Sequence, residues 1–94
     1  MPQVSVLLPC FDAAATLEET LASLARQIHP DFEVVIVDDG SIDDSPFLLD
    51  AWTRKDSRFR VISAAHGGII PALNLGLEAC RGPYIARLDA DDLA

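Results

Sequence analysis

The sequence predicts an α/β fold in which helices cover an open, mostly parallel sheet. Three observations lead to this prediction: short, nearly continuous apolar runs indicate buried strands, helix-length amphipathic segments separate them, and Pro or Gly marks most of the boundaries. Strand and helix alternate three times before a fourth strand, so each connection is long enough for the crossover that parallel strands need. Ligands of such sheets bind at the carboxyl ends of the strands.

The first strand is expected at Val4–Leu8, where Pro9 ends it. Its continuous apolarity is typical of a parallel strand that is covered on both faces. The following helix is expected to begin at Thr16 as N-cap, with Glu19 completing a capping box, and to stop at Pro30. Its sheet-facing stripe would be Leu17, Leu21, Leu24 and Ile28.

The second strand is expected at Phe32–Asp38, and its centre is β-branched throughout. It leads into a tight turn in which Gly40 can adopt a positive φ at little cost. Ser45 as N-cap and Pro46 at the first helical position then predict a second helix.

The third strand is expected at Phe59–Ser63, and its imperfect alternation indicates a position nearer the edge of the sheet. A glycine-containing loop follows, and Pro71 suits the first position of a third helix. Gly76 inside that helix indicates a close contact with a strand, and Gly82 suits the position just past the helix end. The apolar stripe would be Ile70, Leu73, Leu77 and Cys80, and a fourth strand begins at Tyr84.

Composition limits the class of protein. The 94 residues are half hydrophobic, enough for one small domain with a core. The formal net charge of −8, from 15 acidic and 7 basic residues, argues against binding to nucleic acid or anionic lipid. We find no signal peptide and no bilayer-spanning stretch. The two cysteines, Cys10 and Cys80, lack metal-ligand spacing and suit buried thiols in a reducing cytoplasm.

Three carboxylates, Asp89, Asp91 and Asp92, directly follow the last strand. Such close acids repel one another, and a divalent cation such as Mg²⁺, Mn²⁺ or Ca²⁺ would relieve this repulsion. The alternative is a solvated acidic loop end. Asp38 and Asp39 follow the second strand, so both acidic clusters are expected at the same rim of the sheet. One of this second pair is expected only to close the turn.

Other residues near this rim leave two interpretations open. His66 would contact a phosphate or be an ordinary loop histidine, and Asn74 would reach the rim or face solvent. The chain carries no Walker or dinucleotide-binding glycine pattern and no Ser-His-Asp or Cys-His set. These absences leave the acidic rim as the candidate site.

Four motifs in order resemble family 2 glycosyltransferases of the GT-A fold, a Rossmann-like α/β fold. They are Val4–Pro9, then Val37–Ser45, then Ala72–Ala79 followed by Gly82–Ile85, and last Leu88–Asp92. The match covers nearly the whole chain, and although each motif is weak alone, their combination is highly specific. It implies that residues 1–94 are the nucleotide-sugar-binding part of a glycosyltransferase domain, ending after an Asp-x-Asp element.

The resemblance also implies roles for individual residues. Pro9 would lie beside the nucleoside, and Asp39 would bond the nucleobase with Asp38 as a supporting neighbour. Asp89 would meet the ribose. Asp89 and Asp91 would hold Mn²⁺ or Mg²⁺ on the diphosphate, with Asp92 as a substitute ligand.

The chain departs from the family pattern at two positions. Asp12 follows Phe11 at the position where the family usually has an Asn that often follows a Tyr. Asp12 is still a candidate for binding the nucleotide. Leu73 stands where the third motif often has Arg.

The implied reaction transfers a sugar, with inversion, from a nucleotide diphosphate sugar to an acceptor. A UDP-sugar is the expected donor. Cell-envelope polysaccharide synthesis would be a typical setting. The acceptor could be a sugar, a lipid-linked sugar or a protein. Such a transfer needs a base for the acceptor hydroxyl, and no residue here can be assigned that role. We therefore expect donor and metal binding without turnover by this piece, and self-association through apolar surface that the rest of the enzyme would cover. The alternative is a non-catalytic or decayed interaction domain of the same fold.

Overall fold

A computed structural model describes residues 3–27 and 31–88 of the chain. Its four strands form one sheet in the order β3-β2-β1-β4, and every pairing is parallel. This confirms the predicted α/β fold with a parallel sheet and the edge position of the third strand. The elements in chain order are β1 (Val4–Cys10), α1 (Ala14–Gln27), β2 (Phe32–Asp39), α2 (Ser45–Lys55), β3 (Phe59–Ala64), α3 (Ile69–Ala79) and β4 (Tyr84–Arg87).

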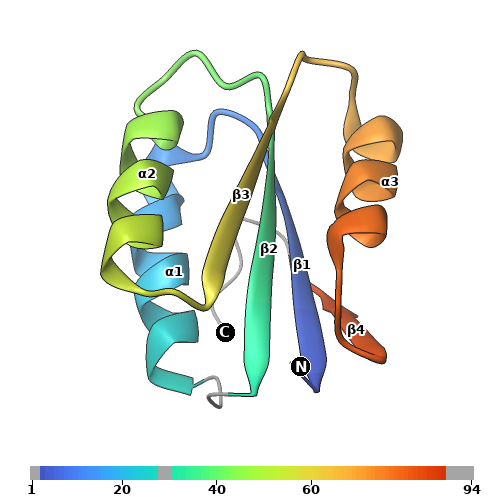
Figure 1. The fold of residues 1–94 in the computed structure, drawn as a ribbon. Helices are drawn as coiled ribbons and strands as arrows, with labels where there is room; N and C mark the ends of the chain where they lie inside the picture. Colours follow the sequence, from blue (N-terminus) through green and yellow to red (C-terminus); the bar gives the residue numbers. More distant parts are fainter. Residues whose placement is uncertain (1–2, 28–30, 89–94) are drawn as a thin grey trace.

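Helices cover both faces of the sheet (Figure 1): α1 and α2 lie on one face and α3 on the other. Alternate residues of each central strand therefore point to different cores. In β1, Leu8 packs in the core beneath α1 and α2, whereas Leu7 packs with Ala72 of α3. Burial on both faces explains why the strands show continuous apolar runs instead of alternation.

Pro9 lies inside β1, opposite Val37 of β2, and does not end the strand as predicted. The backbone of Leu7 faces β4, because its carbonyl accepts the N–H of Leu88 at 3.0 Å. The nitrogen of Pro9, two residues further on, faces the same side. The described pairing with β4 stops at Leu7. The N–H that proline lacks would therefore point beyond the paired part of β4, and its absence removes no hydrogen bond between β1 and β2.

The helix starts differ from the predicted ones. α1 begins at Ala14, so the predicted capping box of Thr16 and Glu19 is wrong. Residues around the start of α2 accept the N–H groups around the start of α1 instead. The N–H of Ala13 donates to Ser45 Oγ and that of Ala14 donates to Asp43 Oδ2, both at 3.1 Å. Ser45 is itself the first residue of α2 and not its N-cap, which is Asp44.

α3 packs on the sheet through small residues. It begins at Ile69, two residues before the predicted Pro71, and its buried residues are Ala72 and Gly76. The predicted stripe is wrong in part, because Ile70 and Leu77 are 65% and 48% exposed. A Cβ at Gly76 would overlap the side chain of Leu7, which confirms the close helix–strand contact.

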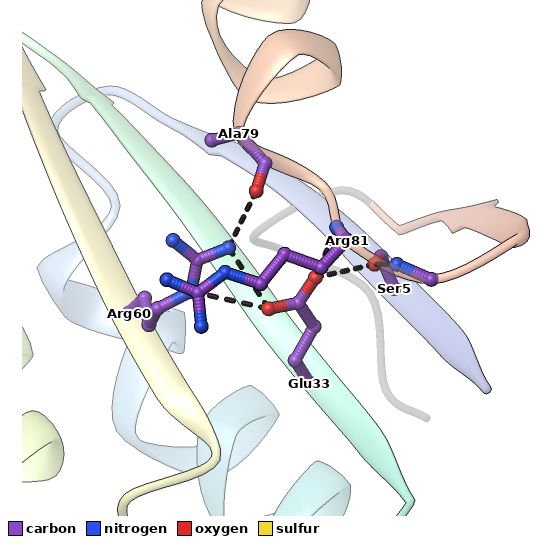
Figure 2. Close-up of polar contacts among 6 residues, drawn as sticks. Ser5, Glu33, Arg60, Ala79 and Arg81 are labelled. Atoms are coloured by element: carbon purple, nitrogen blue, oxygen red, sulfur yellow. Dashed lines mark hydrogen bonds and ion pairs between the residues drawn. The ribbon is translucent and has the colours of Figure 1, made fainter. Parts of the chain in front are cut away.

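A polar network fixes the carboxyl end of α3 to the sheet (Figure 2). It lies at the amino ends of the strands, opposite the loops that follow their carboxyl ends. Buried Glu33 accepts hydrogen bonds from Ser5 Oγ, from the Arg60 guanidinium at 2.8 Å and from the backbone N–H of Arg81 at 2.7 Å. Arg60 also donates to the carbonyl of Ala79. The network joins three strands to one helix end.

Gly82 belongs to the same region but does not act as a left-handed helix cap. The glycines with positive φ in the described part of the chain are Gly40 and Gly68. The N–H of Gly82 donates to Ser5 Oγ at 2.8 Å, and a Cβ at this position would lie 2.9 Å from the backbone of β1. Glycine is therefore needed for close approach to the strand.

Large apolar side chains remain exposed on α3 and β4, including Ile70 and Leu77 of α3 and Tyr84 and Ile85 of β4. No helix within residues 3–27 and 31–88 is long and apolar enough to cross a membrane.

Candidate functional site

Three loops gather at the carboxyl ends of β1, β2 and β3 (Figure 1). They span residues 11–13, 40–44 and 65–68. Parallel strand direction alone brings these loops together, as predicted. The sequence-predicted residues Pro9, Asp12, Asp38 and Asp39 all lie at this edge.

Asp38 and Asp39 have different surroundings, because consecutive strand residues point to opposite faces. Both are buried. Asp38 lies on the α1–α2 side, where its Oδ1 accepts the N–H of Ser41 at 3.2 Å and so closes the turn. Gly40 in this turn has φ +76°, as predicted. The purely structural role expected for one member of the pair thus fits Asp38.

Asp39 lies on the α3 side and binds the β3–α3 loop. Its Oδ1 accepts the N–H of Gly67 and its Oδ2 the N–H of Gly68, each at 3.0 Å. The Nδ1 atom of His66 lies 3.1 Å from Oδ2. The hydrogen bond from Gly67 is the main reason that the pKa of Asp39 is held below its usual value, with Gly68 and His66 adding to the effect. Asp39 is therefore an anionic acceptor at neutral pH.

A cavity of about 230 Å³ opens beside this carboxylate. One wall is aromatic: the rings of Phe11 and His66 are stacked, with centroids 4.3 Å apart and planes 24° from parallel. A mostly apolar cavity with one carboxylate suits a flat ring that carries an N–H group. The lining residues are Pro9, Cys10, Phe11, Asp39, His66, Gly68, Ile69 and Ala72.

Asp12 holds two loops together and is not among the residues that line this cavity. It has a left-handed backbone, φ +47°, which Asp tolerates better than most residues. Its N–H donates to Ser41 Oγ at 2.9 Å, and its Oδ1 accepts the N–H of Ile42 at 2.8 Å. Its neighbour Phe11 is the residue that reaches the cavity. A nucleotide contact of Asp12 stays a prediction.

Two features of this site were missed by sequence reasoning. The ring stack of Phe11 on His66 joins two loops that are far apart in the chain, and no local pattern announces it. The backbone donors of Gly67 and Gly68 are the second feature. The sequence predicted only that these two glycines form a loop. Their position after a strand end could have indicated that their N–H groups lie near the site.

The predicted metal ligands Asp89, Asp91 and Asp92 lie outside the described residues. They follow Leu88, which lies beside β1 at the end of β4. Within the described part of the chain, no group of three or more His, Cys, Asp or Glu side chains could hold a metal ion. The metal site therefore stays a prediction for the acidic stretch.

A second hollow, of about 640 Å³, lies between α2 and the edge strand β3. Asp38 and Arg60 are among its lining residues, and Arg60 is already engaged with Glu33. Its position on the α1–α2 side separates it from the cavity at Asp39.

A parallel α/β sheet with a carboxylate and an apolar cavity at its carboxyl edge has the arrangement in which proteins of this fold class bind ligands. The family comparison is more specific: the model of glycosyl transferase family 2 matches residues 5–94, and the chain belongs to this family.

Individual relatives agree. The chain is 39% identical over 92 residues to an uncharacterized glycosyltransferase, EpsJ, of Bacillus subtilis, covering 98% of the chain and 27% of the relative. The fold of this chain matches that of the mannosyltransferase PcManGT from Pyrobaculum calidifontis in complex with GDP-Man and Mn²⁺, with a TM-score of 0.89. The two are 30% identical, and the match covers 98% of this chain and 28% of that protein. The fold also matches TarS 1–349 of S. aureus in complex with UDP-GlcNAc, with a TM-score of 0.87 and 31% identity over 99% and 27%.

These comparisons confirm the predicted family and the GT-A-like, Rossmann-like fold. The chain spans about a quarter of the length of the relatives it matches here.

Proposed function

We propose that this chain binds the nucleotide of a nucleotide diphosphate sugar for a glycosyl transfer reaction. The observation that carries the proposal is the buried Asp39 carboxylate in the lining of the apolar, aromatic-walled cavity. The base would stack on Phe11 in place of the His66 ring, beside Pro9, and donate a ring N–H to Asp39. Uracil and guanine both carry such an N–H, which agrees with the UDP-GlcNAc and GDP-Man complexes of the structural neighbours.

The diphosphate is assigned to the acidic stretch after β4. Asp89 and Asp91, with Asp92 as a substitute, would hold Mn²⁺ or Mg²⁺; oxygen ligands suit both ions, and a neighbour is in complex with Mn²⁺. When bound, such a cation supplies Lewis-acid stabilisation of the departing diphosphate. The chain's contribution is to orient the donor from its base end.

The complete reaction would be sugar transfer with inversion to an acceptor hydroxyl, which requires a general base. No residue of this chain is assigned that role, and the chain spans 27% of its relative EpsJ. We propose that these 94 residues bind donor and metal but do not turn over alone. Self-association through apolar surface that the rest of the enzyme would cover stays a prediction that sedimentation would test.

The test is calorimetry of UDP on this chain with and without Mn²⁺. We expect binding that Mn²⁺ strengthens, and loss of that Mn²⁺ dependence in the double variant Asp89→Ala/Asp91→Ala. Asp50→Ala is the matched control, because this acid lies exposed on α2 and pairs with Arg54. Unchanged Mn²⁺-dependent binding in the double variant would show that the metal assignment is wrong.

The second candidate is a non-catalytic domain that keeps the fold. It would be favoured if the folded wild-type chain bound neither UDP nor GDP in the presence of Mn²⁺. Asp39 also bonds the β3–α3 loop, so the feature that argues against this candidate is the open apolar cavity beside the carboxylate.

A further inference from the structure

The His66 ring makes the two contacts proposed for the bound base, one with Phe11 and one with Asp39. It stacks on Phe11 at 4.3 Å, and its Nδ1 lies 3.1 Å from Asp39 Oδ2. We propose that His66 is an internal competitor, occupying the base position in the free protein and leaving it when a nucleotide binds. This inference rests on the proposed nucleotide site, and it concerns how strongly that site selects its ligand.

The chemistry of the contact fixes which ring atom carries hydrogen. Nδ1 of His66 lies 3.1 Å from Asp39 Oδ2 and 3.1 Å from the backbone carbonyl oxygen of the same residue. Both oxygens are acceptors only, so Nδ1 must be a donor. A planar aromatic ring with an N–H directed at a carboxylate is the same arrangement that a uracil or guanine ring would present.

The hydrogen bonds to Asp39 show which donor can leave. Gly67 and Gly68 donate through their backbones, and Gly68 is the N-cap of α3, so their release would disturb the start of the helix. The His66 side chain is 58% exposed and can swing into solvent. Its departure frees an Oδ2 lone pair and one face of Phe11 together.

The backbone of His66 cannot move as readily as its side chain. A Cβ built on Gly40 would lie 2.7 Å from the backbone nitrogen of His66, so the two loops touch closely here. Exchange between the occupied and open states is therefore a side-chain rotation on a fixed loop. Such rotations are fast, so the two states stay at equilibrium, and a low open fraction lowers the association rate and the affinity of the ligand by the same factor.

The competition has a measurable consequence. The apparent affinity of a ligand falls by the fraction of molecules whose site is open. A ring stack and one hydrogen bond to a carboxylate keep that fraction low, so we expect His66→Ala to bind UDP roughly three- to tenfold more tightly than wild type. His66→Phe keeps the stack but has no N–H for Asp39, and its affinity should fall between the two.

The experiment is calorimetry of UDP with Mn²⁺ on the wild-type chain, both variants and the control Ala65→Gly. Ala65 is exposed in the same loop, so its replacement loosens the backbone without touching the ring, and its UDP affinity should equal that of wild type. Weaker or unchanged UDP binding by folded His66→Ala, while wild type binds, would overturn the competitor role alone. Absence of UDP binding by both would overturn the proposed function and this inference with it.

A second measurement needs no substitution. In the free wild-type chain the ring protons of His66 should show an upfield NMR shift from Phe11. Addition of UDP should move them to the values of a solvent-exposed histidine. Ring protons that keep their contact with Phe11 in the UDP complex, judged by cross-relaxation between the two rings, would overturn the proposal even if the variants failed to fold.

Discussion

Gly76 and Leu7 are in direct contact: the helix backbone at Gly76 lies on the Leu7 side chain, with no room between them for a methyl group. A Cβ at this position would also lie 3.0 Å from Val37 Cγ2. The contact sets the distance between α3 and the centre of the sheet. It therefore also sets where the amino end of α3, with Gly68, meets Asp39.

Gly76→Ala should destabilise the chain. Alanine favours a helix over glycine by about 1 kcal/mol, but overpacking a buried contact costs roughly 1–3 kcal/mol. We expect a net loss of about 1 kcal/mol in the free energy of unfolding, measured by urea denaturation. Gly67→Ala is the control, because its Cβ would find no atom closer than 3.7 Å and its φ is not positive. Equal stability of the two variants would contradict the contact.

Much of the fold follows from the sequence because its two central strands, β1 and β2, are buried on both faces. Burial of this kind requires continuous apolar runs, and such runs are visible without knowledge of their neighbours. The helix starts are harder, since Asp43 bonds the N–H of Ala14 across 29 residues of chain. A cap supplied from another loop leaves no local signal, whereas the local signal at Thr16 was misleading.

For the candidate site, the sequence predicted where Asp39 lies in the fold but not which residues surround it. Asp39 could be placed because strand ends determine where a ligand binds in parallel sheets. The predicted apolar stripe of α3 was wrong at Ile70 and Leu77 because the helix lies too close to the sheet for large side chains to fit beneath it. The stack of Phe11 on His66 depends on the loops' positions in space, which no periodicity encodes.

Asp39→Asn should loosen the β3–α3 loop. The amide keeps one acceptor oxygen but turns an N–H₂ toward the N–H of Gly67 or Gly68, so one of these bonds is lost. We expect amide hydrogen exchange at that glycine to accelerate roughly tenfold or more. NMR-detected exchange measures this, with the N–H of Ser41, which bonds Asp38, as the internal reference. Unchanged exchange at both glycines would refute the assigned contacts.

Acid should destabilise the chain through Glu33, Asp39 and Asp56. Burial alone would raise the pKa of Glu33, but hydrogen bonds from Ser5, the Arg81 backbone and Arg60 outweigh burial and lower it. The pKa of Asp39 is lowered chiefly by Gly67, and that of Asp56 chiefly by its hydrogen bond from Arg58. Each lowered pKa means that the unfolded state binds more protons in acid. The stabilisation is thus complete above the ordinary carboxyl pKa and is lost as pH falls through the lowered folded value.

The measurement is the melting temperature between pH 7 and pH 3. It should stay level until the pH approaches the ordinary carboxyl range and then fall. Glu33→Gln should be less stable at pH 7 by about 2–4 kcal/mol, since the amide leaves the partly buried Arg60 without its charge partner. Its acid loss should be shallower, because one titrating group is gone. An equally steep loss in this variant would show that Glu33 does not contribute to the acid dependence.

Cys10 should be chemically inert in the folded chain. Burial, and next the charge of Asp38, raise the pKa of its thiol to about 11. At pH 8 only about one thiol in a thousand would then be ionised, and its 3% exposure restricts access further. We expect a Cys80→Ala variant, which isolates Cys10, to react with a thiol reagent at least a hundredfold more slowly than the same protein in urea. Rapid labelling of Cys10 without denaturant would mean that the carboxyl end of β1 opens far more often than its packing beneath α1 and α2 allows.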